Sequence, residues 1–174
     1  MFRSLLCVIS LASSEGWAYS KQPVRVLDAN VYHLGTPGFP EWDEFAKSQA
    51  HGRRLDIQFK AEPNSTPQTL FIRQRQVKAH WTVLLNNQRL GNLLNIDSKL
   101  VHSITVPPGK LKAGLNTLSI VAPKTTDDIE VGPITLTAQP EAEIFSAPLN
   151  VNVTNKQTGR PTPSRITIVD AYGA

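Results

Sequence analysis

Hydrophobic and polar residues alternate along most of the chain from Val24 onward, which is the period of a strand with one buried face. The clearest run places Leu55, Ile57 and Phe59 between polar residues, and the turn-forming segment 63–67 closes it. The same pattern predicts strands over residues 24–27, 69–77, 78–85, 101–106, 117–121 and 129–136. Only Glu41–Ser48 suits a helical turn, because Pro40 can precede one.

One tight hairpin is predicted from residue types alone. Trp81, Val83 and Leu85 share one face of a strand, so we expect them in the core. Asn86 and Asn87 follow directly, and asparagine tolerates the positive φ that a two-residue hairpin turn needs. A second tight connection is expected further along, over residues 111–116.

Short strands with turns between them, and no helix to cover a parallel sheet, are typical of an all-β, antiparallel β-sandwich or jelly roll. We expect that domain over residues 24–138, followed by a polar linker at 139–145. Alternation resumes in 146–174, predicting the first strands of a second small β-sandwich module. Two strands cannot bury a core. They either pack on the first domain or, as we prefer, the natural chain continues past Ala174.

The first twenty residues have the layout of a secretory signal peptide. Arg3 supplies a positive start, residues 4–12 are apolar, and small residues occupy 18 and 20. A buried strand or a membrane anchor is the alternative, but the apolar run is half the length that spans a bilayer. Cleavage would also remove Cys7, the only cysteine. We therefore expect a secreted protein, periplasmic or at the cell surface, without a disulfide and without a membrane span.

The net charge of the chain says little about what it binds. The 174 residues carry 18 Lys and Arg against 14 Asp and Glu, a net charge of +4. Arg73, Arg75 and Lys78 form the densest basic group, and the spacing of the two arginines indicates the solvated face of a strand. No aromatic residues interleave with them for base stacking, so we expect no nucleic-acid partner.

Three segments resemble the galactose-binding-like jelly roll carried by many secreted hydrolases. They are Trp81–Gly91, Leu111–Ile120, with its Gly-x-Asn turn before an alternating strand, and Asp127–Ile134. The segment Leu149–Ile168 is similar to the opening of a carboxypeptidase-regulatory-like or Ig-like module. In this order, the two modules resemble the N-terminal region of exported CehA/McbA-type metallohydrolases, whose catalytic domain of the polymerase-and-histidinol-phosphatase class comes later.

The resemblance implies that the parent protein is a metal-dependent hydrolase and that the partner of this segment is the downstream catalytic domain of the same chain. It implies that divalent metals bind in the downstream catalytic domain and that no cofactor binds in these 174 residues. A site of that class needs clustered His and Asp. The four histidines, His33, His51, His80 and His102, are scattered, so no catalytic residue carries over and none is predicted in these 174 residues.

Aromatic residues gather in one long loop region, where sugar-binding sandwiches place stacking faces. The candidate ligand-binding residues are Tyr32, His33, Phe39 and Trp42, with a glycan as the expected partner. Alternatively, Trp42 and Phe45 plug one end of the sandwich, because an apolar pair three residues apart on a helical turn faces one way. For that pair we favour the plug.

Metal-binding candidates are weak. Asp127 and Asp128 beside Glu130 are compatible with a structural calcium, which binds carboxylates and backbone oxygens, but equally with a simple strand entry. A zinc ion between His80 and His102 is conceivable, although single histidines on strands are more often surface or structural residues.

The sequence leads to two hypotheses about function. The first is a non-catalytic accessory region of a larger exported metal-dependent hydrolase, used for docking, scaffolding or ligand binding. The second is a free-standing secreted carbohydrate-binding module.

Overall fold

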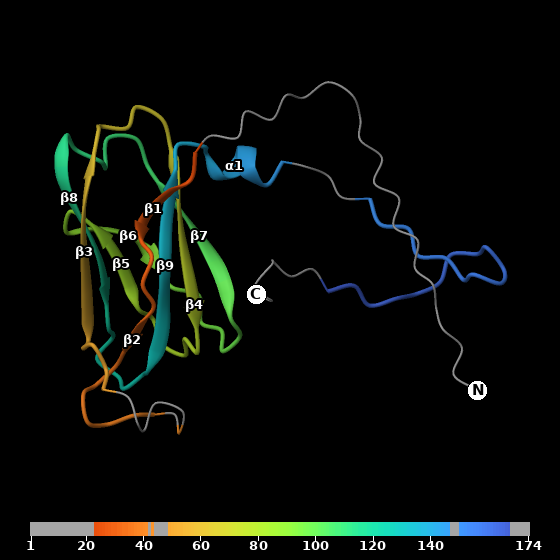
Figure 1. Cartoon of the computed structure of the whole chain (residues 1–174), viewed down its shortest axis with the longest axis horizontal. Coiled ribbons are helices and arrows are strands. Elements are labelled where there is room, and N and C mark those ends of the chain that lie inside the picture. The colour runs from red at the N-terminus through yellow and green to blue at the C-terminus, as the bar shows by residue number, and fades with distance from the viewer. Residues whose placement is uncertain (1–22, 42, 44–48, 147–149, 168–174) are drawn as a thin grey trace.

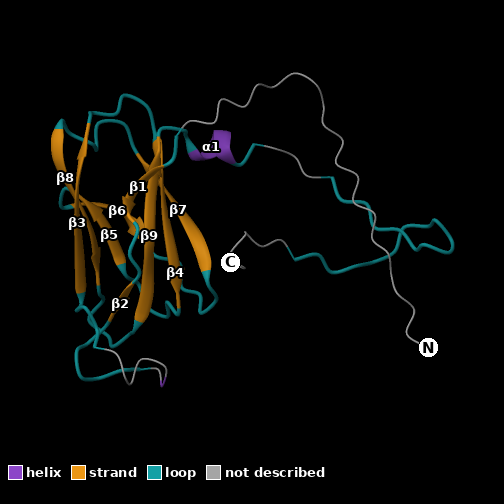
Figure 2. Cartoon of the chain, in the orientation of Figure 1, coloured by secondary structure: helices purple, strands orange, loops and turns teal. Residues whose placement is uncertain are grey.

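The computed structural model describes residues 23–41, 43, 49–146 and 150–167. Residues 25–137 form two antiparallel sheets packed face to face, which confirms the predicted all-β sandwich (Figures 1 and 2). The predicted signal peptide, most of the helical turn at Glu41–Ser48, and Trp42 lie outside the described residues.

Nine strands and one short helix are described. The strands are β1 (Arg25–Asp28), β2 (Tyr32–Leu34), β3 (Arg54–Ala61), β4 (Gln68–Arg75), β5 (Thr82–Leu85), β6 (Gln88–Asn92), β7 (Leu100–Val106), β8 (Gly114–Val121) and β9 (Ile129–Thr137). Sheet A has the order β1-β9-β4-β7, with β2 also paired to β9. Sheet B has the order β3-β8-β5-β6. Every strand pair is antiparallel.

The core lies between the two sheets, where the alternating residues of each strand meet. Leu55, Ile57 and Phe59 of β3 are buried, which confirms the predicted strand and its inner face. Trp81, just before β5, is fully buried, as its alternation with Val83 predicted. Apolar burial of this kind is the main stabilising term of such a fold.

The hairpin between β5 and β6 is confirmed in detail. Asn86 and Asn87 have φ angles of 52° and 64°, the left-handed conformation that the turn requires. The connection predicted over residues 111–116 is shorter than expected, because β8 already begins at Gly114, opposite Ala61 of β3. The buried Asn116 side chain closes that turn by donating to the carbonyl of Lys112.

The segment after the sandwich begins with a short helix. Within the predicted linker, α1 (Glu141–Ile144) sits against the end of β7, where the Glu141 carboxylate accepts hydrogen bonds from Ser103 and Thr105. Within residues 150–167, a turn is closed by a bridge between Thr154 and Pro161, and the second module stays a prediction. No helix among the described residues is long and apolar enough to cross a membrane.

Candidate functional site

The predicted aromatic residues are spread over β2 and the loop after it. The Tyr32 hydroxyl donates to Asp28 at 2.9 Å, which raises the pKa of Tyr32, and its ring meets His51 edge to face. Phe39 is 71% exposed in the loop. Tyr32 and His33 are neighbours on a strand, so they point to opposite faces. A shared binding surface at these residues stays a prediction.

His33 lies on β2, and its side chain is mostly buried. Its Nε2 is 3.8 Å from the fully buried carboxylate of Asp128, and its side chain is only 12% exposed. Gly35 begins the loop directly after β2, and a Cβ there would lie 1.6 Å from Oδ1 of Asp128. The loop can therefore approach the carboxylate this closely only because residue 35 has no side chain.

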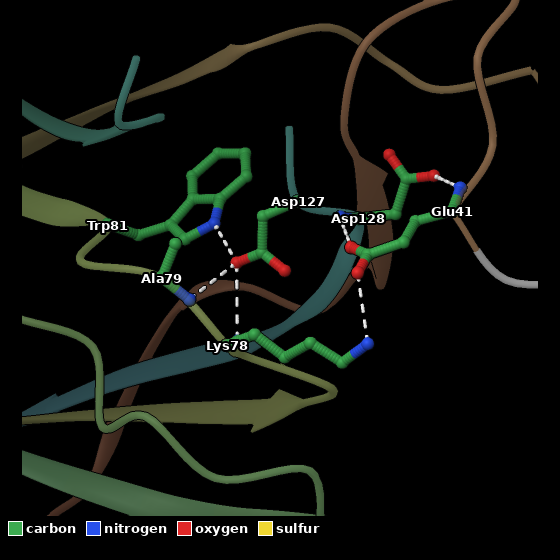
Figure 3. A network of polar contacts seen from close by, with 6 residues as sticks. All are labelled: Glu41, Lys78, Ala79, Trp81, Asp127 and Asp128. Atoms are coloured by element: carbon green, nitrogen blue, oxygen red, sulfur yellow. Dashed lines mark hydrogen bonds and ion pairs between the residues drawn. The ribbon is translucent and has the colours of Figure 1, made fainter. Parts of the chain in front are cut away.

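Asp127 is hydrogen-bonded within the core of the molecule. Its Oδ2 accepts from the backbone N–H of Lys78 at 3.3 Å, the backbone N–H of Ala79 at 3.0 Å and the indole Nε1 of Trp81 at 2.8 Å (Figure 3). Burial raises the pKa of Asp127, while these three donors act in the opposite direction. The carboxylate thus joins the segment before β5 to the start of β9.

Hydrogen bonds between Asp128 and Glu41 connect the loop after β2 to the residues just before β9. Asp128 Oδ2 accepts from the backbone N–H of Glu41 at 2.5 Å, and a Glu41 carboxylate oxygen accepts from the backbone N–H of Asp128 at 3.3 Å. The other oxygen of Glu41 pairs with Lys78 Nζ at 2.9 Å, and Figure 3 shows that lysine extending toward it. We call the six residues of Figure 3 the Asp127 network.

The candidate metal ligands are His80, His102, Asp127 and Asp128. Within the described parts of the chain, no group of three or more His, Cys, Asp or Glu is placed to hold a metal ion. His102 on β7 faces the backbone carbonyl of Asn92, and burial lowers its pKa, while His80 is exposed before β5. The calcium suggested at Asp127 and Asp128 stays a prediction.

A pocket on the outer face of sheet A is one candidate site among the described residues. Its volume is about 360 Å³, within the range of small-ligand sites. We call it the Arg73 pocket, and its lining residues are Val31, Arg73, Gln74, Arg75, Lys99, Glu130, Gly132 and Pro133.

A β-bulge lies in the wall of this pocket. Ile72 and Gln74 of β4 pair with Ile134 and Val131 of β9, so Arg73 alone stands opposite two residues, Gly132 and Pro133. Bulges re-aim side chains and accommodate proline inside a sheet. Gly132 has a φ of 103°, and a Cβ there would meet the carbonyl oxygen of Asn30 at 2.1 Å. The loop between β1 and β2 therefore closes directly over the bulge.

The charges of the pocket come from three strands or their ends. Arg75 lies opposite Glu130, and its Nε contacts the Glu130 carboxylate at 2.9 Å, both side chains being about one-third exposed. Arg73 lies opposite Val101 of β7, so Lys99, just before that strand, lies next to the end of β4. Sequence reasoning placed Arg73 and Arg75 on one solvated face but missed Lys99, and it grouped them with Lys78, which belongs to the Asp127 network.

A second cavity of about 340 Å³ lies on sheet B. We call it the Asn86 cavity, and its lining residues are Arg54, Asp56, Gln58, Asn86, Asn87, Lys112 and Thr117. Its polar groups largely bind one another. Arg54 donates to both carboxylate oxygens of Asp56, lowering the pKa of that carboxyl, and Ser119 bonds to both residues. Asn86 accepts from the backbone of Thr117.

Comparison with solved structures finds similarities at low sequence identity. No family model and no curated protein matches the chain. A CBM36-1 domain of a multidomain xylanase from the hindgut metagenome of Trinervitermes trinervoides is 10% identical with a TM-score of 0.33, over 59% of this chain and 95% of that domain. A Podospora anserina GH26-CBM35 β-(1,4)-mannanase is 18% identical with a TM-score of 0.35, over 64% of this chain and 27% of the mannanase. Similarity at this level assigns neither ligand nor activity.

Proposed function

We propose that the chain is a non-catalytic carbohydrate-binding module and that the Arg73 pocket holds the sugar. The single observation that carries the proposal is the combination of surfaces in this pocket. The side chain of Val31, 58% exposed, and the ring of Pro133 provide apolar contact, while Arg73, Arg75 and Glu130 provide hydrogen-bonding groups. A pyranose ring has the same division, with C–H groups on its faces and hydroxyls at its edge.

The Asn86 cavity supports this function less well. Its size is similar, but Arg54 and Asp56 already form a closed set of hydrogen bonds with Ser119. A ligand there would have to replace those bonds, and displacement of satisfied polar contacts weakens the net gain on binding. For this reason we place the ligand on sheet A.

The test is nuclear magnetic resonance titration of the isotope-labelled chain with a panel of neutral and acidic oligosaccharides. We expect saturable shifts of the backbone amides of Val31, Arg73 and Gly132, with those of Asn86 and Asn87 unmoved. Shifts confined to the amides of Asn86 and Asn87 would show that the sugar binds in the Asn86 cavity and would contradict the Arg73 pocket. No shift with any member of the panel would contradict carbohydrate binding.

We also propose that the module is part of a larger exported hydrolase. Its resemblance to the front of CehA/McbA-type metallohydrolases supports an accessory role beside a downstream catalytic domain, in a secreted or periplasmic protein. A free-standing module is the alternative. The coding sequence beyond Ala174 distinguishes them, because a hydrolase of this class requires a His-x-His with further His and Asp, whereas an immediate stop codon would leave the free-standing module.

A further inference from the structure

We propose that residues 139–146 are a docked joint rather than a flexible linker, and that the outer face of sheet A is the surface that holds this joint. The joint sets the direction in which the chain beyond Ser146 leaves the sandwich. The partner of this surface is therefore a segment of the same chain. This inference goes beyond the proposed sugar binding and does not depend on it.

The joint crosses the strands of sheet A one after another, in the order β9, β4, β7. Strand β9 ends two residues before Gln139, whose carbonyl accepts a hydrogen bond from the hydroxyl of Thr69 on β4 at 2.7 Å. Two residues further along, the carboxylate of Glu141 reaches β7. It accepts hydrogen bonds from Ser103 at 2.6 Å and from Thr105 at 2.8 Å. The segment is thus bonded to each strand that it passes.

Burial at this end of sheet A is an independent observation. Thr69 and Thr137 lie directly opposite each other on β4 and β9, on the outer face, because Leu70 and Leu136 beside them point into the core. Threonine on an outer face is mostly exposed. Yet Thr69 is 0% and Thr137 2% exposed, and both hydroxyls bond to the backbone of Gln139. The joint therefore covers them.

Helix α1 turns one side toward the sheet. Glu141 and Ile144 are three residues apart, so they share a face of the helix, and both are partly buried, whereas Ala142 and Glu143 are exposed. Figure 1 shows α1 beside the upper end of sheet A. Hydrogen bonds to a carboxylate are stronger than those between neutral groups. Those to Glu141, above all the one from Ser103, lower the pKa of its carboxyl.

The joint lies on the face that also carries the Arg73 pocket. Thr69 and Arg73 both belong to the outer face of β4, and four residues along a strand span about 13 Å. The chain beyond Ser146 therefore starts on the pocket's side of the sandwich. A rigid joint keeps it there, beside a ligand bound in the pocket. Only this last consequence rests on the proposed function.

The experiment is nitrogen-15 NMR relaxation of the full chain, which measures backbone order parameters. We expect values of about 0.8 for residues 139–145, equal to those of β7, whereas a flexible linker would fall below about 0.6. Glu141→Ala should lower the values of α1 below about 0.6 and leave those of β4 and β7 unchanged. Glu143→Ala removes the same group from the exposed side of the same helix, so this matched control should change nothing.

A second variant removes the partners instead of the carboxylate. Ser103→Ala combined with Thr105→Val deletes both hydroxyl donors and should loosen α1 as much as Glu141→Ala does. Order parameters below about 0.6 for residues 139–145 of the wild type would overturn the docked joint. Equal loosening by Glu141→Ala and Glu143→Ala, or none in Glu141→Ala and the double variant, would overturn the contact with β7 as its cause. No sugar is used, so these results are independent of the proposed function.

Discussion

The Asp127 network and the Arg73 pocket both concentrate charge near β9, but the charges are used differently. In the network, Asp127 is 1% exposed and one of its oxygens accepts three hydrogen bonds from the chain itself. In the pocket, Arg75 and Glu130 are about one-third exposed and line a cavity open to a ligand. Asp127 thus makes its contacts inside the fold, whereas Arg75 and Glu130 lie in the wall of a pocket at the surface.

The comparison predicts two kinds of mutational effect. Changes in the Asp127 network should lower the free energy of unfolding and leave ligand affinity alone. Changes in the Arg73 pocket should lower ligand affinity and leave the free energy of unfolding unchanged. The predictions below follow that contrast from the largest expected effect to the smallest.

Asp127→Ala should be the most damaging change. It leaves the N–H groups of Lys78, Ala79 and Trp81 without their acceptor in the interior, at a cost of about 3 kcal/mol in the free energy of unfolding. Urea denaturation of the variant and the wild type measures this loss of free energy. Asp97→Ala, at an exposed position, is the control and should stay within about 0.5 kcal/mol of the wild type. Equal stability of the two variants would remove the network's structural role.

Gly35→Ala should come next. The new Cβ would stand 1.6 Å from Oδ1 of Asp128, so the loop must move away from the buried carboxylate. Overpacking of this kind costs about 2 kcal/mol. Gly91→Ala is the matched control, since its Cβ would meet only Ile104 at an ordinary 3.8 Å. A loss at Gly91 as large as that at Gly35 would show that the close approach to Asp128 is not the cause.

The pH dependence of stability should report the burial of Asp127. Burial raises its pKa above the ordinary 3.8, so the ionised form opposes folding. The wild type should therefore gain stability relative to Asp127→Asn as pH falls from neutral, through the raised pKa, to 3.8. Urea denaturation of both proteins at several pH values in that window measures the difference. A difference that is constant with pH, or that grows in the opposite direction, would contradict a raised pKa.

Lys78→Ala should have the smallest effect. Its ion pair with Glu41 has side chains that are 43% and 28% exposed, and exposed pairs contribute about 0.5 kcal/mol or less. Thermal or urea unfolding should show this difference shrinking at high salt. A loss comparable with that of Asp127→Ala would mean that the lysine has a larger part in the network than its exposure indicates.

The sequence was most informative where local chemistry decides the structure. Alternation gave the inner face of β3, and two consecutive asparagines gave the turn at Asn86 and Asn87, because each depends only on neighbouring residues. The start of β8 was placed too late, because pairing of Gly114 with Ala61 of β3 extends that strand, and such pairing is not visible in the local pattern.

The candidate site was harder to predict because it depends on the register between strands. Arg73 and Arg75 were assigned to one face, yet the pocket is also lined by Lys99, just before β7, and by the bulge in β9. One signal could have pointed to it. A Gly-Pro pair within a strand pattern indicates a bulge, and Gly132-Pro133 has that form. Likewise, nothing local showed that Asp127 would meet the indole of Trp81.

The most direct test of the central claim measures stability and ligand affinity together on Arg73→Gln and Asp127→Asn. Urea unfolding gives the first quantity, and calorimetric titration with an oligosaccharide that shifts the amides of the Arg73 pocket gives the second. The account predicts that Arg73→Gln loses affinity about tenfold with its free energy of unfolding unchanged, while Asp127→Asn changes stability and keeps its affinity within about twofold. Loss of stability without loss of affinity in Arg73→Gln would contradict it.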